Sequence, residues 1–270
     1  MRDMPSGSSF ESTVLLVDDP RFKPAMRLMD LGEFPSALEH LNALLGQLTP
    51  EERVVALHWK AHCFIALGEI SQARACLDEA FMEVGTNAPL VMCLKLANAI
   101  LLGIEDSPEH AAAEIKSLLE VYACELKPPG FSWTYVYAKA CLGIYLLRSN
   151  NYTEAGAALE EALSLETRPL HRYIKRMYLG DSYYKLGDLN RARDQFEGAL
   201  RELESIPGPE IPPDYKVQPR YELALIAYMQ NHFDDAHGQL ALVSDVAVQS
   251  PKLQKVINRL KVLLEPGASS

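Results

Sequence analysis

The sequence predicts an all-α fold, a solenoid of about six stacked helical hairpins with a C-terminal capping helix. Three observations indicate this: a recurring turn residue, small residues at fixed distances from it, and helix-start signals before the hairpins. The turn positions, 36 to 46 residues apart, are Gly32, Gly68, Ile104, Asn150, Gly187 and Asn231. Self-similarity at this period is typical of stacked supersecondary units rather than of a single globular core.

Small side chains lie seven places before every turn position and five places after every one except Ile104. Five places after the turn the sequence has Ala37, Ala73, Ala155, Ala192 and Ala236. Seven places before it stand Ala25, Ala61, Ala97, Gly143, Gly180 and Ala224. Small residues at both places let two antiparallel helices approach closely. Gly and Asn at the turn tolerate the positive φ that a tight helix–helix connection needs.

Helix-start signals set the order of the elements. Thr49-Pro50-Glu51-Glu52 has the spacing of a capping box, Ser107-Pro108 and Ser250-Pro251 are similar starts, and Pro35 fits the first turn of a helix. We therefore expect twelve paired helices within residues 18–249. The six repeats are expected to start near residues 18, 54, 90, 136, 173 and 217.

The remaining segments fall outside the hairpins. Residues 250–264 are apolar on one helical face and basic on the other, which predicts a capping helix or, alternatively, a docking helix. Residues 1–17 are expected to be a partly flexible extension and residues 265–270 a flexible tail. Two proline-rich insertions, residues 127–130 and 205–214, are interpreted as stiff spacers or as binding loops.

Composition excludes several classes of protein. The net charge of −10 argues against sequence-independent binding of nucleic acid, which needs clustered Lys and Arg. No run approaches 18 apolar residues, so we expect no membrane insertion. The N-terminus lacks the apolar centre of a secretory signal, and the five cysteines never form a C-x-x-C pair. Buried thiols in a reducing compartment are the simplest reading, and we expect a cytoplasmic location.

The repeat motifs resemble the tetratricopeptide repeat (TPR) family over about residues 18–247. The fifth copy carries most of the family pattern, in Leu179-Gly180, Tyr183, Gly187, Ala192, Phe196 and Ala199. The early Trp of the family is absent from every copy, and Ile104 replaces the turn residue of the third. The resemblance implies a right-handed α-solenoid of TPR-like hairpins, with ligands held on the concave wall built by the first helix of each hairpin.

The positions that match this wall form the predicted partner-binding groove. They include His58, His62, Asn98, Tyr137, Arg148, Met177, Asp181, Tyr184, Lys185, Tyr221 and Tyr228. Tyr and Met side chains would supply apolar burial, and the polar ones would orient a bound peptide. The same Tyr and Met could instead fill a tight superhelix.

Two further groups of residues suggest other sites. His58 and His62 have the i, i+4 spacing of two metal ligands, but no third ligand is indicated, so lining of an inner helix is the preferred interpretation and no metal is predicted. A basic stretch could bind a carboxylate or acidic ligand, or could be a solvated helix face. Its members are Arg168, Arg172, Lys175 and Arg176.

A cation also recurs where the family normally has Trp, at Arg21, Lys139, Arg176 and Arg220. It could form a ladder along one edge or reflect solvent exposure at that position. The sequence leaves both readings open.

No sequence motif points to catalysis. The chain has no G-x-S-x-G, no glycine-rich phosphate loop and no H-E-x-x-H. We therefore predict a non-catalytic adaptor without a cofactor that binds a peptide or partner protein in its concave groove. The alternatives are a regulatory sensor that closes on a small peptide or acidic ligand, and a structural subunit that assembles through its edges.

Overall fold

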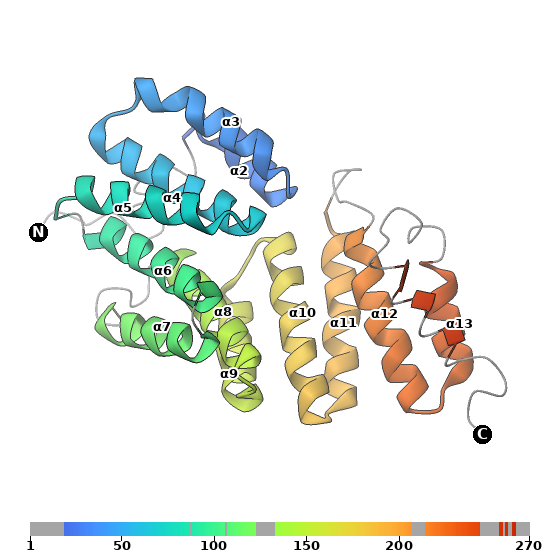
Figure 1. Cartoon of the computed structure of the whole chain (residues 1–270). Coiled ribbons are helices and arrows are strands. Elements are labelled where there is room, and N and C mark those ends of the chain that lie inside the picture. The colour runs from blue at the N-terminus through green and yellow to red at the C-terminus, as the bar shows by residue number, and fades with distance from the viewer. Residues whose placement is uncertain are drawn as a thin grey trace, which may run out of the picture. The chain divides into compact units, whose positions relative to one another are not determined.

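The computed structural model describes residues 19–86, 88–105, 107–122, 133–206 and 214–243, together with residues 254–255, 257–258 and 261–262. This part of the chain is helical and contains no strand, which confirms the predicted all-α fold. The chain divides into two compact units, residues 1–165 and residues 166–270. Figure 1 shows the helices of both units, and each unit is treated by itself below.

The described part of the first unit contains four consecutive helix pairs. Their helices are α2 (Lys23–Asp30) and α3 (Phe34–Leu44), α4 (Pro50–Leu67) and α5 (Ile70–Glu83), α6 (Ala88–Glu105) and α7 (Pro108–Tyr122), and α8 (Trp133–Arg148) and α9 (Tyr152–Leu165). A single 3₁₀ turn, η1 (Leu45–Gln47), follows α3. Within each pair the two helices pack along their length, and the second helix also packs on the first helix of the next pair.

The described part of the second unit contains two pairs of the same kind. They are α10 (Pro169–Leu186) with α11 (Leu189–Glu204), and α12 (Asp214–Met229) with α13 (Phe233–Ala241). Helix α11 packs against α12 and so joins the two pairs. The first helices of the pairs, α10 and α12, carry most of the site residues that the sequence predicts for this unit.

Five of the hairpin turns share one hydrogen-bonding pattern. At Gly68 the backbone N–H donates to the Ile65 carbonyl at 3.1 Å, and the N–H of Glu69 donates to the Phe64 carbonyl at 2.8 Å. Equivalent bonds close the turns at Gly32, Asn150, Gly187 and Asn231. Each of these residues has a positive φ, between 62° and 80°. Left-handed residues of this kind satisfy the last carbonyls of a helix, as the sequence predicted for Gly and Asn.

The third copy departs from this pattern. Ile104, the residue at the predicted turn position, lies inside α6, which continues to Glu105. A β-branched residue takes a positive φ only with strain, so the helix runs on past it.

The small residues lie where the two helices of a pair touch. The alanines at both fixed positions are fully buried. A Cβ added to Gly143 would lie 2.5 Å from Cγ of Leu159, and one added to Gly180 would lie 2.6 Å from Cε1 of Phe196. The close approach predicted from sequence is therefore present in α8/α9 and in α10/α11.

Two predicted helix starts are also confirmed. Thr49 and Glu52 form a reciprocal capping box at α4, in which the Thr49 N–H donates to Oε2 of Glu52 at 2.9 Å. Oγ of Ser107 accepts from the N–H of His110 at 3.1 Å at the start of α7. These side chains satisfy amide groups that the first turn of a helix leaves without a partner.

Several predicted segments lie partly or wholly outside the described residues. Residues 1–17, 127–130 and 265–270 are outside, and so are residues 207–213 of the second insertion. In the segment predicted as a capping helix, the six described residues are helical, and Ile257 is fully buried in a cluster with Val217, Leu240 and Val243.

Candidate functional site

The second unit brings polar site residues together between α10 and α12. Asp181 and Lys185 lie one turn apart on α10, and both interact electrostatically with Glu222 on α12. The Tyr184 hydroxyl on α10 donates to Sδ of Met229 on α12 at 3.4 Å. We call this surface the α10–α12 face and define it by Asp181, Tyr184, Lys185, Glu222 and Met229.

The carboxyl groups of this face have strongly raised pKa values. Burial raises the pKa of Asp181 to about 6, against the opposing charge of Lys185. Burial and the nearby Asp181 raise the pKa of Glu222 to about 7, although Gln218 donates to it at 2.7 Å. Burial, followed by Glu222, also raises the pKa of Tyr184. Both carboxyl groups of the face therefore titrate closer to neutral pH than an exposed Asp or Glu does.

Three other predicted groove residues of this unit pack against its cores. Met177 lies beside the cluster of Tyr173, Ala199 and Leu203. Tyr221 and Tyr228 are half-buried against the cluster around Val217 and Ala224. The ring of Tyr228 also contacts Phe233 edge to face at 5.8 Å. These residues therefore contribute to the folding of the second unit.

In the first unit, the predicted residues His58, His62 and Tyr137 belong to an aromatic cluster. The ring of His62 on α4 contacts that of Tyr137 on α8 edge to face, with centroids 5.8 Å apart. Trp133 stacks on Tyr137 at 5.0 Å and also meets Trp59 of α4 at 5.6 Å. Reasoning from sequence missed both tryptophans. Trp59 adjoins His58 and Trp133 precedes Tyr137 by one helical turn, so helical spacing from the predicted residues is the signal that could have found them.

The two histidines are neutral and lie edge to face rather than side by side. Their ring centroids are 4.6 Å apart with an interplanar angle of 76°. Burial, and then the neighbouring His62, lowers the pKa of His58, and burial lowers the pKa of His62 to about 4. Nδ1 of His58 and Nε2 of His62 are buried and have no hydrogen-bond partner among the described residues. In the same part of the chain, no group of three or more His, Cys, Asp or Glu side chains is arranged to hold a metal ion.

Asn98 and Arg148 lie away from this cluster. Asn98 lines a groove of about 520 Å³ between α6 and α7, together with Lys95, Leu102 and Val121. The guanidinium of Arg148 lies over the ring of Tyr145, 5.6 Å from its centroid. The structure thus brings together some of the predicted groove residues within each unit and separates others.

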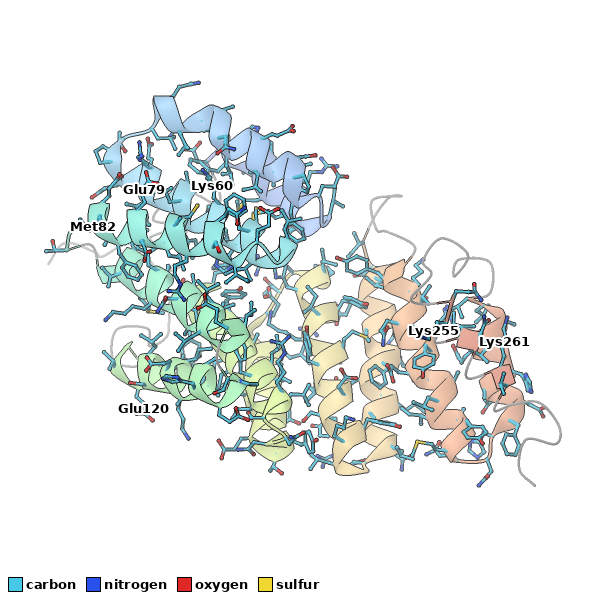
Figure 2. The ribbon with its side chains drawn as sticks, in the orientation of Figure 1. Lys60, Glu79, Met82, Glu120, Lys255 and Lys261 are labelled. Carbon is cyan, nitrogen blue, oxygen red and sulfur yellow. The ribbon has the colours of Figure 1, made fainter. Side chains whose placement is uncertain are left out.

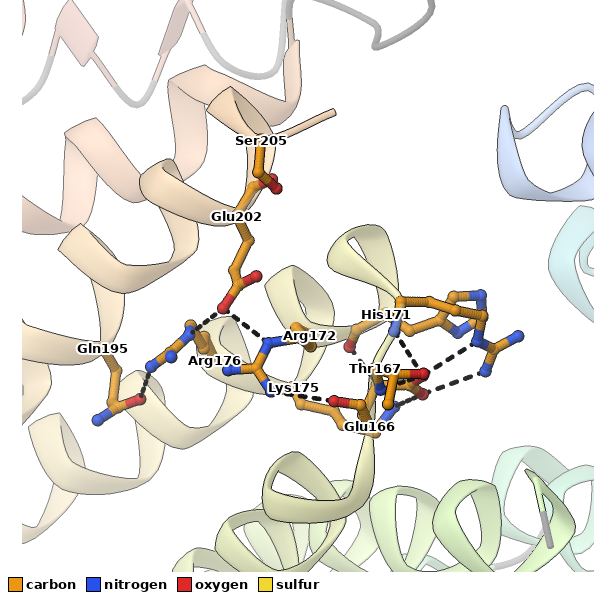
Figure 3. A network of polar contacts seen from close by, with 10 residues as sticks. Glu166, Thr167, His171, Arg172, Lys175, Arg176, Gln195, Glu202 and Ser205 are labelled. Carbon is orange, nitrogen blue, oxygen red and sulfur yellow. Dashed lines mark hydrogen bonds and ion pairs between the residues drawn. The ribbon is translucent and has the colours of Figure 1, made fainter. Parts of the chain in front are cut away.

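The predicted anionic-ligand patch is a network of internal ion pairs (Figure 3). Arg168 and Lys175 both bind the Glu166 carboxylate, at 3.0 and 2.9 Å. Arg172 and Arg176 both donate to Oε1 of Glu202, at 2.9 and 3.0 Å. An anionic ligand at these cations would compete with Glu166 and Glu202, so an anion site here stays a prediction.

The recurring cation of the repeats pairs with the second helix of its own hairpin in three copies. Lys139 on α8 binds Glu161 of α9 at 2.9 Å. Nη1 of Arg176 donates to Gln195 at 3.0 Å, and Nη1 of Arg220 donates to Gln239 at 3.2 Å. The position that holds Trp in the family resemblance here holds a polar brace between the two helices of a hairpin.

The comparisons with known proteins agree with this architecture. Residues 142–207 match the family model described as Tetratricopeptide repeat. No curated protein matches the sequence. Residues 142–207 therefore contain tetratricopeptide repeats, and the fold of the chain matches that of solved TPR structures.

Solved structures of similar fold come from different systems. PilW, a type IV pilus biogenesis factor, is 16% identical with a TM-score of 0.62, over 89% of this chain and 98% of that one. A thermophilic TPR protein from Thermus thermophilus is 21% identical with a TM-score of 0.55, over 75% and 97%. The apo quorum sensor NprR from B. thuringiensis is 16% identical with a TM-score of 0.63, over 90% and 68%. NprR in complex with its cognate peptide NprX is 16% identical with a TM-score of 0.57, over 97% and 74%.

The fold of these neighbours is one that supports protein interaction. Among the helices in the described part of the chain, none combines the length and the apolar composition needed to span a bilayer.

Proposed function

We propose that the chain is a non-catalytic scaffold that binds a peptide or a segment of a partner protein along the first helices of its hairpins. In the second unit this binding surface is the α10–α12 face. Tyr184 and Met229 supply apolar contact area, and Asp181, Lys185 and Glu222 orient the polar groups of the bound segment.

The observation that supports this most directly is the burial of the Asp181 and Glu222 carboxyl groups without an ion pair. Both carboxyl groups are half-buried, and neither forms an ion pair with any described residue. Burial of a carboxylate without an ion pair costs free energy, which the charge of Lys185 offsets only in part, and apolar residues would serve folding better at these positions. Carboxyl groups kept in such a setting are suited to a ligand that donates hydrogen bonds or carries a cation.

Two further facts support a peptide as the ligand. Tyr and Met side chains adapt to varied apolar partners and are enriched at binding surfaces. NprR, which has the same fold, has been solved with its cognate peptide.

The experiment begins with capture of partners on the wild-type chain and their identification by mass spectrometry. A fluorescent peptide from the captured protein is then titrated against the wild type and against Tyr184→Ala with Tyr228→Ala. We expect the double variant to bind at least about tenfold more weakly, because aromatic anchors dominate binding energy. Tyr184→Phe with Tyr228→Phe keeps the rings and should retain most of the affinity.

Two controls separate binding from folding. Tyr152→Ala removes a half-buried tyrosine of α9, whose hydroxyl donates to Oδ1 of Asn150 outside the face, and should leave binding unchanged. Circular dichroism should report the same helix content in all variants. Equal affinity of the wild type and the Tyr184→Ala, Tyr228→Ala variant would exclude the α10–α12 face as the binding surface.

A further inference from the structure

A second groove in the same unit lies apart from the α10–α12 face. It has a volume of about 520 Å³ and is lined by residues of α11, α12 and α13. Its lining residues are Arg193, Glu197, Leu223, Ala227, Asp234, Asp235, Gly238, Gln239 and Leu242. None of them belongs to the α10–α12 face.

The floor of this groove is apolar. Leu223 and Ala227 of α12 are buried beneath it. Leu242, just beyond the end of α13, is 60% exposed. An aliphatic side chain entering the groove would cover Leu242 and so remove apolar surface from water.

The rim of the groove is acidic. Asp234 and Asp235 of α13 are exposed and form no ion pair with any described residue. Among the described residues, Glu197 of α11 forms only a long ion pair, with Arg201 at 3.8 Å. Arg193, the one cation among the described lining residues, donates to Oε1 of Gln230 and is held there. A basic segment is the partner that these charges complement.

Gly238 keeps the groove open. A Cβ added at Gly103, Gly143, Gly180 or Gly198 would lie within 3 Å of a neighbouring atom, whereas one added at Gly238 would meet nothing within 4 Å. Glycine inside a helix costs about 0.5 to 1 kcal/mol relative to alanine. Packing inside the described unit gives no reason for this cost at Gly238, while a ligand backbone that approaches α13 closely would.

We propose that this groove is a docking site for a short basic segment of a partner protein, one that places an aliphatic side chain beside Lys or Arg. The aliphatic side chain lies on Leu223, Ala227 and Leu242. The cationic side chains reach Asp234, Asp235 and Glu197, and the segment passes closely over Gly238. This site is independent of the proposed peptide binding on the α10–α12 face.

The test uses the full chain and a fluorescein-labelled probe, acetyl-Gly-Lys-Leu-Arg-Lys-Leu-Gly-amide, with the matched probe acetyl-Gly-Glu-Leu-Glu-Glu-Leu-Gly-amide. We expect saturable binding of the basic probe that weakens as salt is raised, and no binding of the acidic one. Asp234→Asn with Asp235→Asn should weaken binding by at least about tenfold and flatten the salt dependence.

Gly238→Leu separates docking from the structural role of the two aspartates. Asp234 and Asp235 also lie in the first turn of α13, where carboxylates stabilise a helix. Gly238→Leu fills the groove without touching that turn, and should reduce probe binding by at least about tenfold while the thermal midpoint stays the same or rises. Gly238→Ala, a smaller change, should fold at least as well as the wild type and bind with intermediate affinity.

Two controls keep the interpretation specific. Asp194→Asn with Glu204→Gln removes two exposed charges of α11 that do not line the groove, and should bind like the wild type. Tyr184→Ala, on the α10–α12 face, should also leave probe binding unchanged. Wild-type affinity in both Gly238→Leu and the Asp234, Asp235 variant would overturn the proposal.

A second copy of the chain is the other possible occupant. Lys255 and Lys261 of the same unit are exposed (Figure 2) and could supply a basic surface to another molecule. Sedimentation of the chain alone distinguishes the two. A monomer agrees with the proposal, whereas an oligomer that dissociates on Asp234→Asn with Asp235→Asn would show that a second copy fills the groove and would overturn it.

Discussion

Nζ of Lys175 lies 2.9 Å from Oε2 of Glu166, and the two side chains are only 5% and 4% exposed. Arg168 binds the same carboxylate, and Arg172 donates to the Glu166 carbonyl at 3.0 Å (Figure 3). The segment that precedes α10 is thereby attached to the first turns of that helix. A buried pair of this kind is costly to break on one side only, because the remaining charge loses its partner.

We therefore expect Glu166→Gln and Lys175→Met each to lower the free energy of unfolding of the second unit, by about 3 kcal/mol for the single variants. The double variant should recover much of this loss, since no charge of the Lys175–Glu166 pair is then left alone. Urea denaturation followed by circular dichroism measures the change. Trp59 and Trp133, the two tryptophans of the chain, both lie in the first unit, so their fluorescence reports on that unit separately. Additive losses in the double variant would contradict this account.

The same carboxylate predicts a response to acid. Burial raises the pKa of Glu166, but the hydrogen bonds from Arg168 and Lys175 outweigh burial and hold the pKa at about 2, below its ordinary value of 4.5. A carboxyl group whose pKa is lowered in the folded state stabilises the fold at pH values above its unfolded-state pKa. This stabilisation is lost as the pH falls through its folded-state pKa. The urea midpoint of the second unit should therefore fall between about pH 4.5 and pH 2. Glu166→Gln should reduce that dependence, and an unchanged acid profile would refute the assignment.

Glu222 predicts a pH dependence of stability with the opposite sign. Burial and Asp181 raise its pKa to about 7 from 4.5, so the folded state binds the proton more tightly than the unfolded state. The stabilisation is present below about pH 4.5 and is lost as pH rises towards 7. Glu222→Gln should thus gain stability relative to the wild type at pH 8 but not at pH 4. Urea midpoints at the two pH values give the comparison, and an equal difference at both would exclude the raised pKa.

Gly180 and Gly187 should respond differently to alanine. At Gly180 the new Cβ would lie 2.6 Å from the ring of Phe196, so we expect overpacking that costs about 1 to 3 kcal/mol and is relieved by Phe196→Leu. At Gly187, where φ is 80° and space is free, the cost is backbone strain of about 1 to 2 kcal/mol. Gly187→Asn should be tolerated better, because Asn occupies the same conformation at positions 150 and 231. Thermal melts of the variants measure these costs, and rescue of Gly187→Ala by Phe196→Leu would contradict the steric distinction.

His58 should limit the stability of the first unit. It is 3% exposed, and its Nδ1 has no hydrogen-bond partner among the described residues. An unsatisfied buried polar atom costs about 1 to 3 kcal/mol, so His58→Leu should raise the free energy of unfolding by about 1 kcal/mol. His40 is the matched control, since its Nε2 lies 2.7 Å from the Arg21 carbonyl oxygen and His40→Leu should destabilise. The urea midpoint measured by tryptophan fluorescence reports the stability of both variants. A loss of stability in His58→Leu would contradict a cost from the unpaired Nδ1 of His58.

Local features of the fold were the most predictable from sequence. The turns at Gly32, Gly68 and Gly187, and the close approach at Gly143 and Gly180, follow from steric properties of single residues. Ile104 was assigned to a turn by its spacing alone, and the structure places it within α6 because its side chain disfavours the left-handed conformation.

Contacts between distant residues were less predictable. The sequence indicated the basic stretch around Arg172, but not that Glu202, 30 residues away along the chain, would bind it. The sequence likewise predicted His62 and Tyr137 as groove positions but not the two tryptophans that pack beside them. It predicted Asp181 but not its neighbour Glu222. The Arg172–Glu202 pair joins the two helices of one hairpin, and it depends on how those helices align. The other pairings join different hairpins and depend on how the hairpins pack on one another, which no residue pattern within one hairpin encodes.

The bonds from Arg176 to Gln195 and from Arg220 to Gln239 join the same two positions in successive repeats, 19 residues apart in each. Each hairpin of the second unit thus fixes the alignment of its own two helices with residues that it carries itself. A module that is internally aligned can be duplicated without redesign of its neighbours, so chains with extra copies of the α10–α11 hairpin offer a direct route to longer arrays built from this protein.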